Sequence, residues 1–451
     1  MNLLALSADL PQDIASYMTC GQWQEAREMI DARLLLDLPQ MLRDRLALAQ
    51  FFMQELKGAY PLSEEQLTTE VRKRIPDFSD DDFRRLRNMG WLDSLRIQGR
   101  RMYFEDSVAS LLKANPDFAA RAGKPLSPSR PLLDDAMAQM KKEGGMRLKL
   151  QLTSTLQLKK DAFVPDRTCY VHLPLPTPAP QQHEVQIIDI QPRPKHIARE
   201  STPQRTAYFE ETMAENLPFV TVSTFEQAPR YVDPLSDSFT GLVYPAARPP
   251  ARDDLEEQLP HLTFTPYLKA LARELVGDEI IPVRQVKRIY DFITGQVLYS
   301  YVRPYLLIEN GAEYAALNLR GDCGLQALLF IALCRITGIP ARWQSGLYAA
   351  PGDEGSHDWA WFYTQPCGWL PADCSFGGAA RRGGSAERRE FYFGNLDPYR
   401  AVFNQAYMGT FQPEGKYLRH DPYDNQSGEA ETADGPLGRG AYRTSHRVQL
   451  L

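Results

Sequence analysis

Three residues in the segment Arg320–Phe376 have types and an order suited to nucleophilic chemistry: Cys323, His357 and Asp373. Cys323 begins a continuous apolar run, which predicts a buried helix with the thiol at its N-terminus. Free backbone N–H groups and the helix dipole favour a thiolate there, so we expect the pKa of Cys323 to be lowered. The same N–H groups could hold an oxyanion. An imidazole beside the thiol, held by a carboxylate, would complete an activated nucleophile.

The elements that must bring these side chains together follow from the pattern around them. The helix is expected to end at Thr337-Gly338-Ile339-Pro340, with glycine at the cap and proline beyond it. A change to period-two alternation then predicts strands over 342–348, 357–363 and 368–373, with a turn at 353–356. Pairing of the last two strands would set His357 beside Asp373. The stretch 377–389, rich in Gly, Ala and Arg, is expected to be a mobile loop near the site.

The motifs around these residues resemble a known family. The sequence reads Gly-Asp-Cys-Gly at 321–324, Ala-Leu-Cys-Arg-Ile-Thr-Gly-Ile-Pro-Ala-Arg at 332–342, His-Asp-Trp at 357–359 and Gly-Trp-Leu-Pro-Ala-Asp at 368–373. Over roughly residues 260–400 it looks like the transglutaminase-like superfamily, whose fold is related to papain. The resemblance implies Cys323 as nucleophile, His357 as base and Asp373 as the residue that orients the imidazole. Trp361 and Cys374-Ser375 depart from residues that the family often carries at those places.

Aromatic residues near the motifs are candidates for substrate contact. Trp359 and Trp361 share one face of the predicted strand with His357, so they either line a substrate groove or belong to the core. The family shows a tyrosine ahead of its nucleophile. Tyr299 or Tyr301 could face the site from that place, with Tyr301 the candidate for substrate contact and packing of both residues as the alternative. A zinc site built from the cysteines lacks the usual closely paired spacing, so we expect no metal and no cofactor.

Length and composition predict several domains of a soluble globular protein, and the helical and alternating stretches along the chain predict the α+β class. The chain has 451 residues, of which 43% are hydrophobic and 24% charged, and a net charge of −6 gives no reason to expect a polyanion partner. The N-terminus lacks a basic signal region, and no apolar run is long enough for a membrane helix. We therefore expect a cytoplasmic protein with no membrane partner, whose six cysteines are mostly reduced.

Three domains are expected along the chain. Residues 1–125 read as a helical domain whose part 60–106 has the helix, helix, hairpin order of a winged helix. Its arginines could contact DNA, but neighbouring acidic residues favour a packing module, so a nucleic-acid partner is not expected. Residues 145–243 predict a β-sandwich. Residues 252–451 predict the catalytic domain, in which the cysteine-bearing helix packs on an antiparallel sheet.

These observations together predict a cysteine enzyme that acts on a peptide or protein substrate. We expect hydrolysis of a peptide or amide bond through a thioester at Cys323, because no calcium-loop pattern accompanies the motifs. Transfer of the acyl group to an amine, as in a cross-linking transglutaminase, remains an alternative. A different class, a binding or scaffold protein with a vestigial triad, also fits the large non-catalytic half of the chain.

Overall fold

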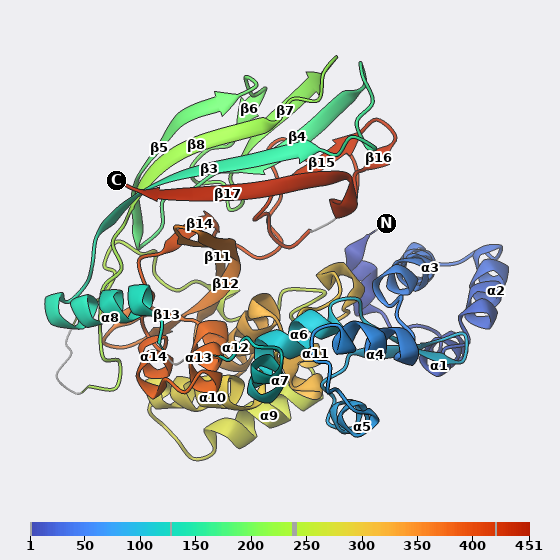
Figure 1. The fold of residues 1–451 in the computed structure, drawn as a ribbon, viewed down its shortest axis with the longest axis horizontal. Helices are drawn as coiled ribbons and strands as arrows, with labels where there is room; N and C mark the ends of the chain where they lie inside the picture. The colour runs from blue at the N-terminus through green and yellow to red at the C-terminus, as the bar shows by residue number, and fades with distance from the viewer. Residues whose placement is uncertain (1, 127–128, 237–240, 420–421) are drawn as a thin grey trace.

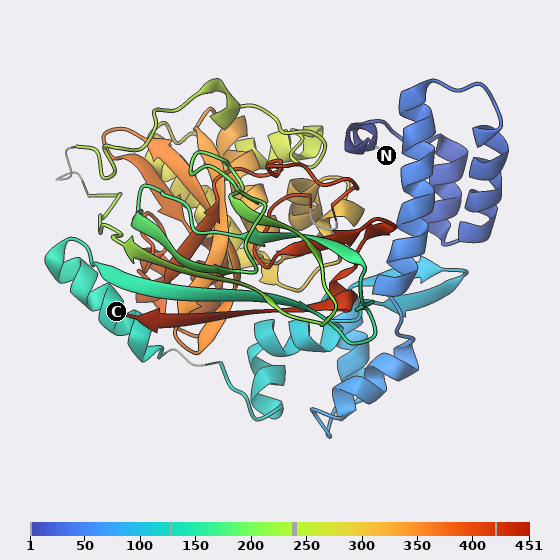
Figure 2. The same ribbon diagram turned by 90° about the horizontal axis from the view of Figure 1, so that it is seen from above.

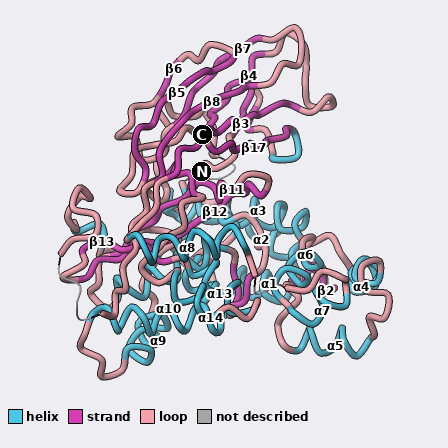
Figure 3. The backbone as a smooth tube through the Cα atoms, turned by 60° about the vertical axis from the view of Figure 1, so that its left-hand side comes forward, coloured by secondary structure: helices cyan, strands magenta, loops and turns pink. Residues whose placement is uncertain are grey.

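The computed structural model describes residues 2–126, 129–236, 241–419 and 422–451. N-terminal helices lie on one side, two antiparallel sheets lie together, and a helix-covered sheet lies beneath them (Figures 1 and 2). Strands gather in the upper part of the molecule and helices in the lower part, as Figure 3 shows. The α+β class predicted from the sequence is confirmed. No helix in the described ranges is long and apolar enough to cross a membrane.

The N-terminal part is mainly helical. Its elements are α1 (Gln12–Cys20), α2 (Trp23–Leu34), α3 (Gln40–Ala59), α4 (Glu64–Arg72), α5 (Asp80–Asn88), β1 (Ser94–Ile97), β2 (Arg100–Tyr103), α6 (Ser107–Ala114) and α7 (Pro116–Arg121). The next helix, α8 (Pro131–Glu143), lies at the opposite side of the molecule (Figure 1) and packs against Phe391 and Tyr392. Ser63 and Ser79 each begin a helix with a capping box, in which the serine side chain accepts the N–H of the residue three positions on. The order α4, α5, β1, β2 matches the helix, helix, hairpin order expected for 60–106.

Three arginines of this module, all on α5, lie next to carboxylates. Arg84 forms an ion pair with Asp81, and Arg85 Nη2 lies 3.5 Å from both Asp82 and Asp117. Arg87 contacts Glu64 at 3.4 Å. These pairs lower the positive potential that a nucleic-acid backbone would meet on this surface.

The middle part consists of two antiparallel sheets that share a hydrophobic core. Its strands are β3 (Leu148–Leu158), β4 (Thr168–Pro174), β5 (Gln182–Gln191), β6 (His196–Ile197), β7 (Thr206–Thr212), β8 (Phe219–Gln227), β15 (Glu429–Thr432), β16 (Gly435–Pro436) and β17 (Tyr442–Leu450). One sheet has the order β17-β3-β8-β5 and the other β16-β15-β4-β7-β6. Alternating side chains such as Leu156 and Phe219 meet Val171 and Phe209 between them.

The last strands of the chain belong to these sheets. β17 pairs along its whole length with β3, and β15 pairs with β4. In Figure 2 the red β17 lies beside the green β3. The range 252–451, which the sequence predicts as the catalytic domain, therefore includes three strands that complete the sheets of the preceding part.

The third part carries the candidate site. Its elements are α9 (Pro266–Val276), α10 (Pro282–Gln296), β9 (Leu298–Tyr299), α11 (Gly311–Asn318), β10 (Arg320–Gly321), α12 (Cys323–Ile336), β11 (Ala341–Ala350), β12 (Asp353–Thr364), β13 (Gly368–Ala372), α13 (Cys374–Arg382), α14 (Ala386–Phe391) and β14 (Arg400–Asn404). The antiparallel sheet β13-β12-β11-β14 has α12 on one face. The side chains of β11 and β14 on the other face pack against β3 and β8.

Two local expectations from the sequence are wrong. Residues 353–356 belong to β12 and pair with β11, because Pro351-Gly352, with φ +80° at Gly352, makes a tighter turn two residues earlier. Residues 377–389 are not a loop but mostly the helices α13 and α14. The glycines of α13 serve close packing, since a Cβ at Gly377 would lie 2.0 Å from the hydroxyl of Tyr290 on α10.

Candidate active site

Cys323 is the first residue of α12, a helix that is buried along nearly its whole length. Asp322 caps this helix by accepting the Leu325 N–H on Oδ1 at 3.0 Å. The same oxygen accepts a 2.6 Å hydrogen bond from the hydroxyl of Tyr305. These contacts fix the turn that carries the thiol. The predicted helix start and its end at Gly338, with φ +78°, are both present.

His357 and Asp373 lie side by side because β12 and β13 pair antiparallel. His357 Nε2 lies 2.7 Å from Asp373 Oδ2. Asp373 is fully buried and also caps α13, where its Oδ1 accepts the Phe376 N–H at 2.8 Å. Burial opposes its ionisation, but the neighbouring His357 and Arg400 hold the pKa of Asp373 below its usual value. Asp373 therefore presents a carboxylate to the imidazole.

The imidazole of His357 is held as a neutral base. Burial lowers its pKa, although the contact with Asp373 acts in the opposite direction. Its Nε2 is hydrogen-bonded to Asp373, so Nδ1 is the ring nitrogen that can interact with the thiol. The ring packs against Phe376 with centroids 4.6 Å apart, which limits its rotation.

The thiol of Cys323 makes its hydrogen bond to Asp358 and not to His357. Sγ lies 3.1 Å from Asp358 Oδ2, and no hydrogen bond joins Sγ to the imidazole among the described residues. Burial, followed by the charges of Asp358 and Asp322, raises the pKa of Cys323 well above its usual value. This result overturns the lowered pKa expected from the helix N-terminus alone, because burial and two carboxyl groups outweigh the helix dipole.

Asp358 is itself an unusual carboxyl group. It is buried, and burial together with Asp424 raises its pKa well above the usual range. Its Oδ1 accepts a 2.6 Å hydrogen bond from Gln426 Nε2, which also donates to the His357 carbonyl oxygen at 3.1 Å. The carboxyl beside the sulfur is thus fixed by a segment more than 60 residues away in sequence.

Two cavities meet at Cys323. The smaller, of about 360 Å³, is lined by Cys323 and His357 together with Tyr299, Phe376, Lys113 and Arg382. The larger, of about 800 Å³, is lined by Cys323, Asp322, Asp358 and Gln426, and its far wall comes from α3 and the residues after β2. Helices of the N-terminal part therefore help to enclose the thiol. Cys323 and His357 face one space, in which a reacting group could contact both.

The aromatic residues expected to contact substrate have different places. Tyr301 is 36% exposed and lines the larger cavity. Trp359 and Trp361 are buried, and both indole N–H groups donate to Gln344 Oε1, at 2.8 and 2.9 Å. Neither tryptophan lines either cavity at Cys323, so the structure places both in the core and not in a groove.

Sequence reasoning missed several residues of the site. Asp358 stands next to His357 inside the quoted motif. Its contact with the thiol depends on how α12 packs against β12, which the motif does not reveal. Arg400 is fully buried and donates to Asp373 Oδ2 at 2.8 Å and to Asp397 Oδ2 at 2.6 Å. Arg382 lay in the segment expected to be a loop. No spacing in the sequence singles out Arg400 or Arg382.

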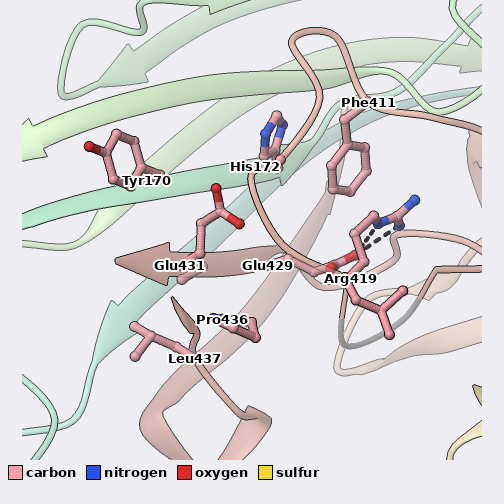
Figure 4. A pocket seen from close by; sticks show the side chains of 11 residues that line it. Tyr170, His172, Phe411, Arg419, Glu429, Glu431, Pro436 and Leu437 are labelled. Carbon is pink, nitrogen blue, oxygen red and sulfur yellow. Dashed lines mark hydrogen bonds and ion pairs between the residues drawn. The ribbon is translucent and has the colours of Figure 1, made fainter. Parts of the chain in front are cut away.

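Another pocket lies between β4, β15 and the segment 411–419 (Figure 4). It encloses only about 20 Å³, and Arg419 pairs with Glu429 at 2.8 Å inside it. His172 stacks on Phe411 with centroids 4.3 Å apart. Such a filled space leaves no room for a substrate. In the described ranges, no group of three His, Cys, Asp or Glu side chains is arranged to hold a metal ion.

The comparison with family models finds a match for one segment of the third part. Residues 269–374 match the model of the Transglutaminase-like superfamily. These residues form a transglutaminase-like core. The match covers Cys323, His357 and Asp373, and it supports a papain-like cysteine enzyme, as the sequence motifs predict. A comparison with curated proteins finds no match.

Several solved structures are similar to this chain at low sequence identity. One, described as a putative cysteine protease from Cytophaga hutchinsonii, is 17% identical, with a TM-score of 0.42 over 68% of this chain and 90% of that chain. The periplasmic domain of TgpA from Pseudomonas aeruginosa is 16% identical, with a TM-score of 0.29 over 56% and 95%. A putative protease from Parabacteroides distasonis is 11% identical, with a TM-score of 0.21 over 53% and 60%.

Proposed function

We propose that the protein is a cysteine hydrolase that cleaves a peptide or amide bond through a thioester on Cys323. The observation that carries the proposal is the cavity that the Cys323 thiol and the His357 imidazole both line. Asp373 contacts the other nitrogen of the imidazole and orients the ring. This is the arrangement that an activated nucleophile needs. The thiol reaches the imidazole by turning from Asp358, as catalytic contacts often tighten only when substrate binds.

The reaction proceeds in two halves. In the first, the Cys323 proton moves to His357 Nδ1, Sγ bonds to the substrate carbonyl carbon, and the carbon–nitrogen bond breaks as His357 gives its proton to the leaving amine. In the second, His357 takes a proton from water, whose oxygen attacks the thioester carbon. The carbon–sulfur bond breaks, the acid leaves, and the proton returns to the sulfur. Asp373 keeps its charge throughout and stabilises the imidazolium that forms in each half.

Backbone N–H groups at the start of α12 are suited to the negative oxygen of the tetrahedral intermediates. Asp322 uses its side chain for Leu325 N–H, which leaves the N–H groups of the first residues of the helix pointing out of its end. The larger cavity offers room for the polypeptide on one side of the scissile bond.

The test is turnover of a protein digest by the full chain in water enriched in ¹⁸O, with methylamine added. Hydrolysis gives new carboxyl groups that carry ¹⁸O, and Cys323→Ser loses them. Products that carry methylamide instead would assign the enzyme to amine transfer. No turnover, together with iodoacetamide labelling of Cys323 that His357→Ala does not slow, would overturn the proposal in favour of a binding protein.

A further inference from the structure

The smaller cavity at Cys323 carries a guanidinium group without a counter-charge. Arg382 is the last residue of α13, the helix that Asp373 caps, and it lines the cavity together with Cys323 and His357. Its Nε is buried and has no hydrogen-bond partner, and the side chain forms no ion pair with any described residue. Burial lowers the pKa of Arg382 to about 10, so the group keeps its charge at neutral pH.

The other arginines near this cavity do have partners. Arg388 pairs with Asp134, and Arg130 lies 3.7 Å from Asp353. Arg381, the neighbour of Arg382 in α13, donates to the Gly295 carbonyl oxygen outside the cavity. Charged groups that are largely removed from water are normally paired, because their desolvation is costly. An unpaired Arg382 beside a nucleophile is therefore suited to an anion that arrives with the substrate.

A second cation lies on the same wall. The Lys113 ammonium lies 4.2 Å from the centre of the Tyr299 ring and 5.0 Å from that of Tyr301, and it has no carboxylate partner among the described residues. The acidic residues of the cavity do not neutralise these cations. Asp353 faces Arg130, and Glu354 Oε1 accepts the Val448 N–H at 2.8 Å.

We propose that the smaller cavity binds a carboxylate of the substrate, on Arg382 with Lys113 beside it. The substrate is then a peptide or amide with a free carboxylate within a few bonds of the scissile carbonyl, as at a peptide C-terminus or on an acidic side chain. A guanidinium suits this role because its parallel N–H groups match both oxygens of a carboxylate. This inference rests on the proposed hydrolase, because it places the anion relative to the bond that Cys323 attacks.

The charges around the larger cavity determine the orientation in which the substrate binds. Asp322 lines it next to Cys323, and Glu55 and Asp106 line it farther away, so a carboxylate on that side would meet like charges. The anionic end of the substrate is therefore drawn to the Arg382 side, and the remainder of the chain extends past Asp358.

Two alkylating reagents test the proposal without a known substrate. Iodoacetate carries a carboxylate and iodoacetamide does not, and both form the same bond to sulfur with loss of iodide. Rate constants at Cys323 are measured by mass spectrometry of its peptide in the full chain. In Arg382→Met the iodoacetate rate is expected to fall about fivefold, which corresponds to roughly 1 kcal/mol of lost attraction. The iodoacetamide rate is expected to stay within about twofold of wild type.

Arg381→Met is the matched control, because Arg381 is adjacent in α13 yet outside the cavity. It should change neither rate, and Arg382→Lys should retain part of the iodoacetate rate. High salt should reduce the iodoacetate rate in wild type more than in Arg382→Met. An equal fall for both reagents in Arg382→Met would mean that Arg382 only supports the fold of the site. Unchanged rates would overturn carboxylate binding while leaving the hydrolase intact.

Binding without the thiol gives an independent readout. Succinate is titrated calorimetrically into Cys323→Ser, alone and combined with Arg382→Met or Arg381→Met. Binding that only Arg382→Met weakens supports the proposal, even if Cys323 proves unreactive in the wild type. No heat of binding, or binding that is equal in all three proteins, would overturn it.

Discussion

Arg400 donates a 2.8 Å hydrogen bond to Oδ2 of Asp373, the same oxygen that meets His357 Nε2. Both partners of this ion pair are fully buried. A second carboxylate, Asp397, contacts Arg400 at 2.6 Å and also accepts from the Tyr392 hydroxyl at 3.0 Å. The carboxylate that orients the proposed base is therefore one end of a buried charged network.

Removal of the central cation should destabilise the protein strongly. In Arg400→Met two buried carboxylates lose their counter-charge, and breaking a buried pair from one side costs about 3–5 kcal/mol. The free energy of unfolding, measured by urea denaturation, is expected to fall by that amount. Arg342→Met, which removes an arginine that contacts the Trp369 ring, is the comparison and should cost less. A loss below about 1 kcal/mol for Arg400→Met would contradict the charged network.

Asp373→Asn should slow the chemistry at Cys323 while keeping the cap of α13. The amide oxygen can still accept the Phe376 N–H, but the amide is neutral and no longer favours a proton on His357 Nε2. His357 Nδ1 then ceases to act as an acceptor for the thiol proton. Loss of this orientation lowers kcat of related triads by about 10⁴, and alkylation of Cys323 by iodoacetamide should fall by at least about tenfold. An unchanged rate would show that the imidazole does not assist the thiol.

Asp358→Asn should make Cys323 more reactive at neutral pH. Asp358 contributes to the raised pKa of the thiol, so its replacement by a neutral amide lowers that pKa and increases the thiolate fraction. Each pKa unit corresponds to about tenfold more thiolate below the pKa. The pH profile of iodoacetamide labelling should therefore move to lower pH. Slower labelling at all pH values would instead assign Asp358 to holding the thiol in its reactive position.

Trp361→Phe distinguishes a core residue from a substrate contact. Trp361 is buried against Tyr244 and donates to Gln344, so the smaller ring leaves a cavity and one hydrogen bond fewer. Unfolding free energy should decrease by about 1–3 kcal/mol, and labelling of Cys323 should not change. Tyr301→Phe, at the wall of the larger cavity, should leave stability nearly unaltered. A selective loss of turnover in Trp361→Phe at unchanged stability would restore the groove interpretation.

Stability should decrease in acid because of buried histidines outside the site. Burial lowers the pKa of His172 to about 3 and the pKa values of His261 and His446 to about 4. Below pH 6.5 the unfolded chain protonates these imidazoles while the folded protein keeps them neutral, so protons favour unfolding. Each contributes a loss of about 1.4 kcal/mol per pH unit between 6.5 and its folded pKa. His446→Gln should reduce the slope of the unfolding free energy against pH, measured by urea denaturation at successive pH values. An unaltered slope would contradict the contribution of His446 to acid sensitivity.

The sequence predicts the core of the site well because local patterns determine it. An apolar run beginning at Cys323 and two alternating strands are enough to place the thiol at a helix start and His357 beside Asp373. Arg400 and Gln426 reach the site through long-range packing, which no local spacing reveals. The glycines of α13 indicate a loop by composition, yet they are needed where the helix approaches Tyr290. Tertiary contact there overrides local propensity.

The pairing of β17 with β3 bears on any attempt to work alone with the part that carries Cys323. A fragment that starts at residue 252 would keep β15 and β17 but lose the partners that hold them, and their main-chain groups would become open templates for other molecules. The face of β11 and β14 that now rests on β3 and β8 would meet solvent as well. Biochemical dissection of this protein should therefore proceed by point substitution in the intact polypeptide.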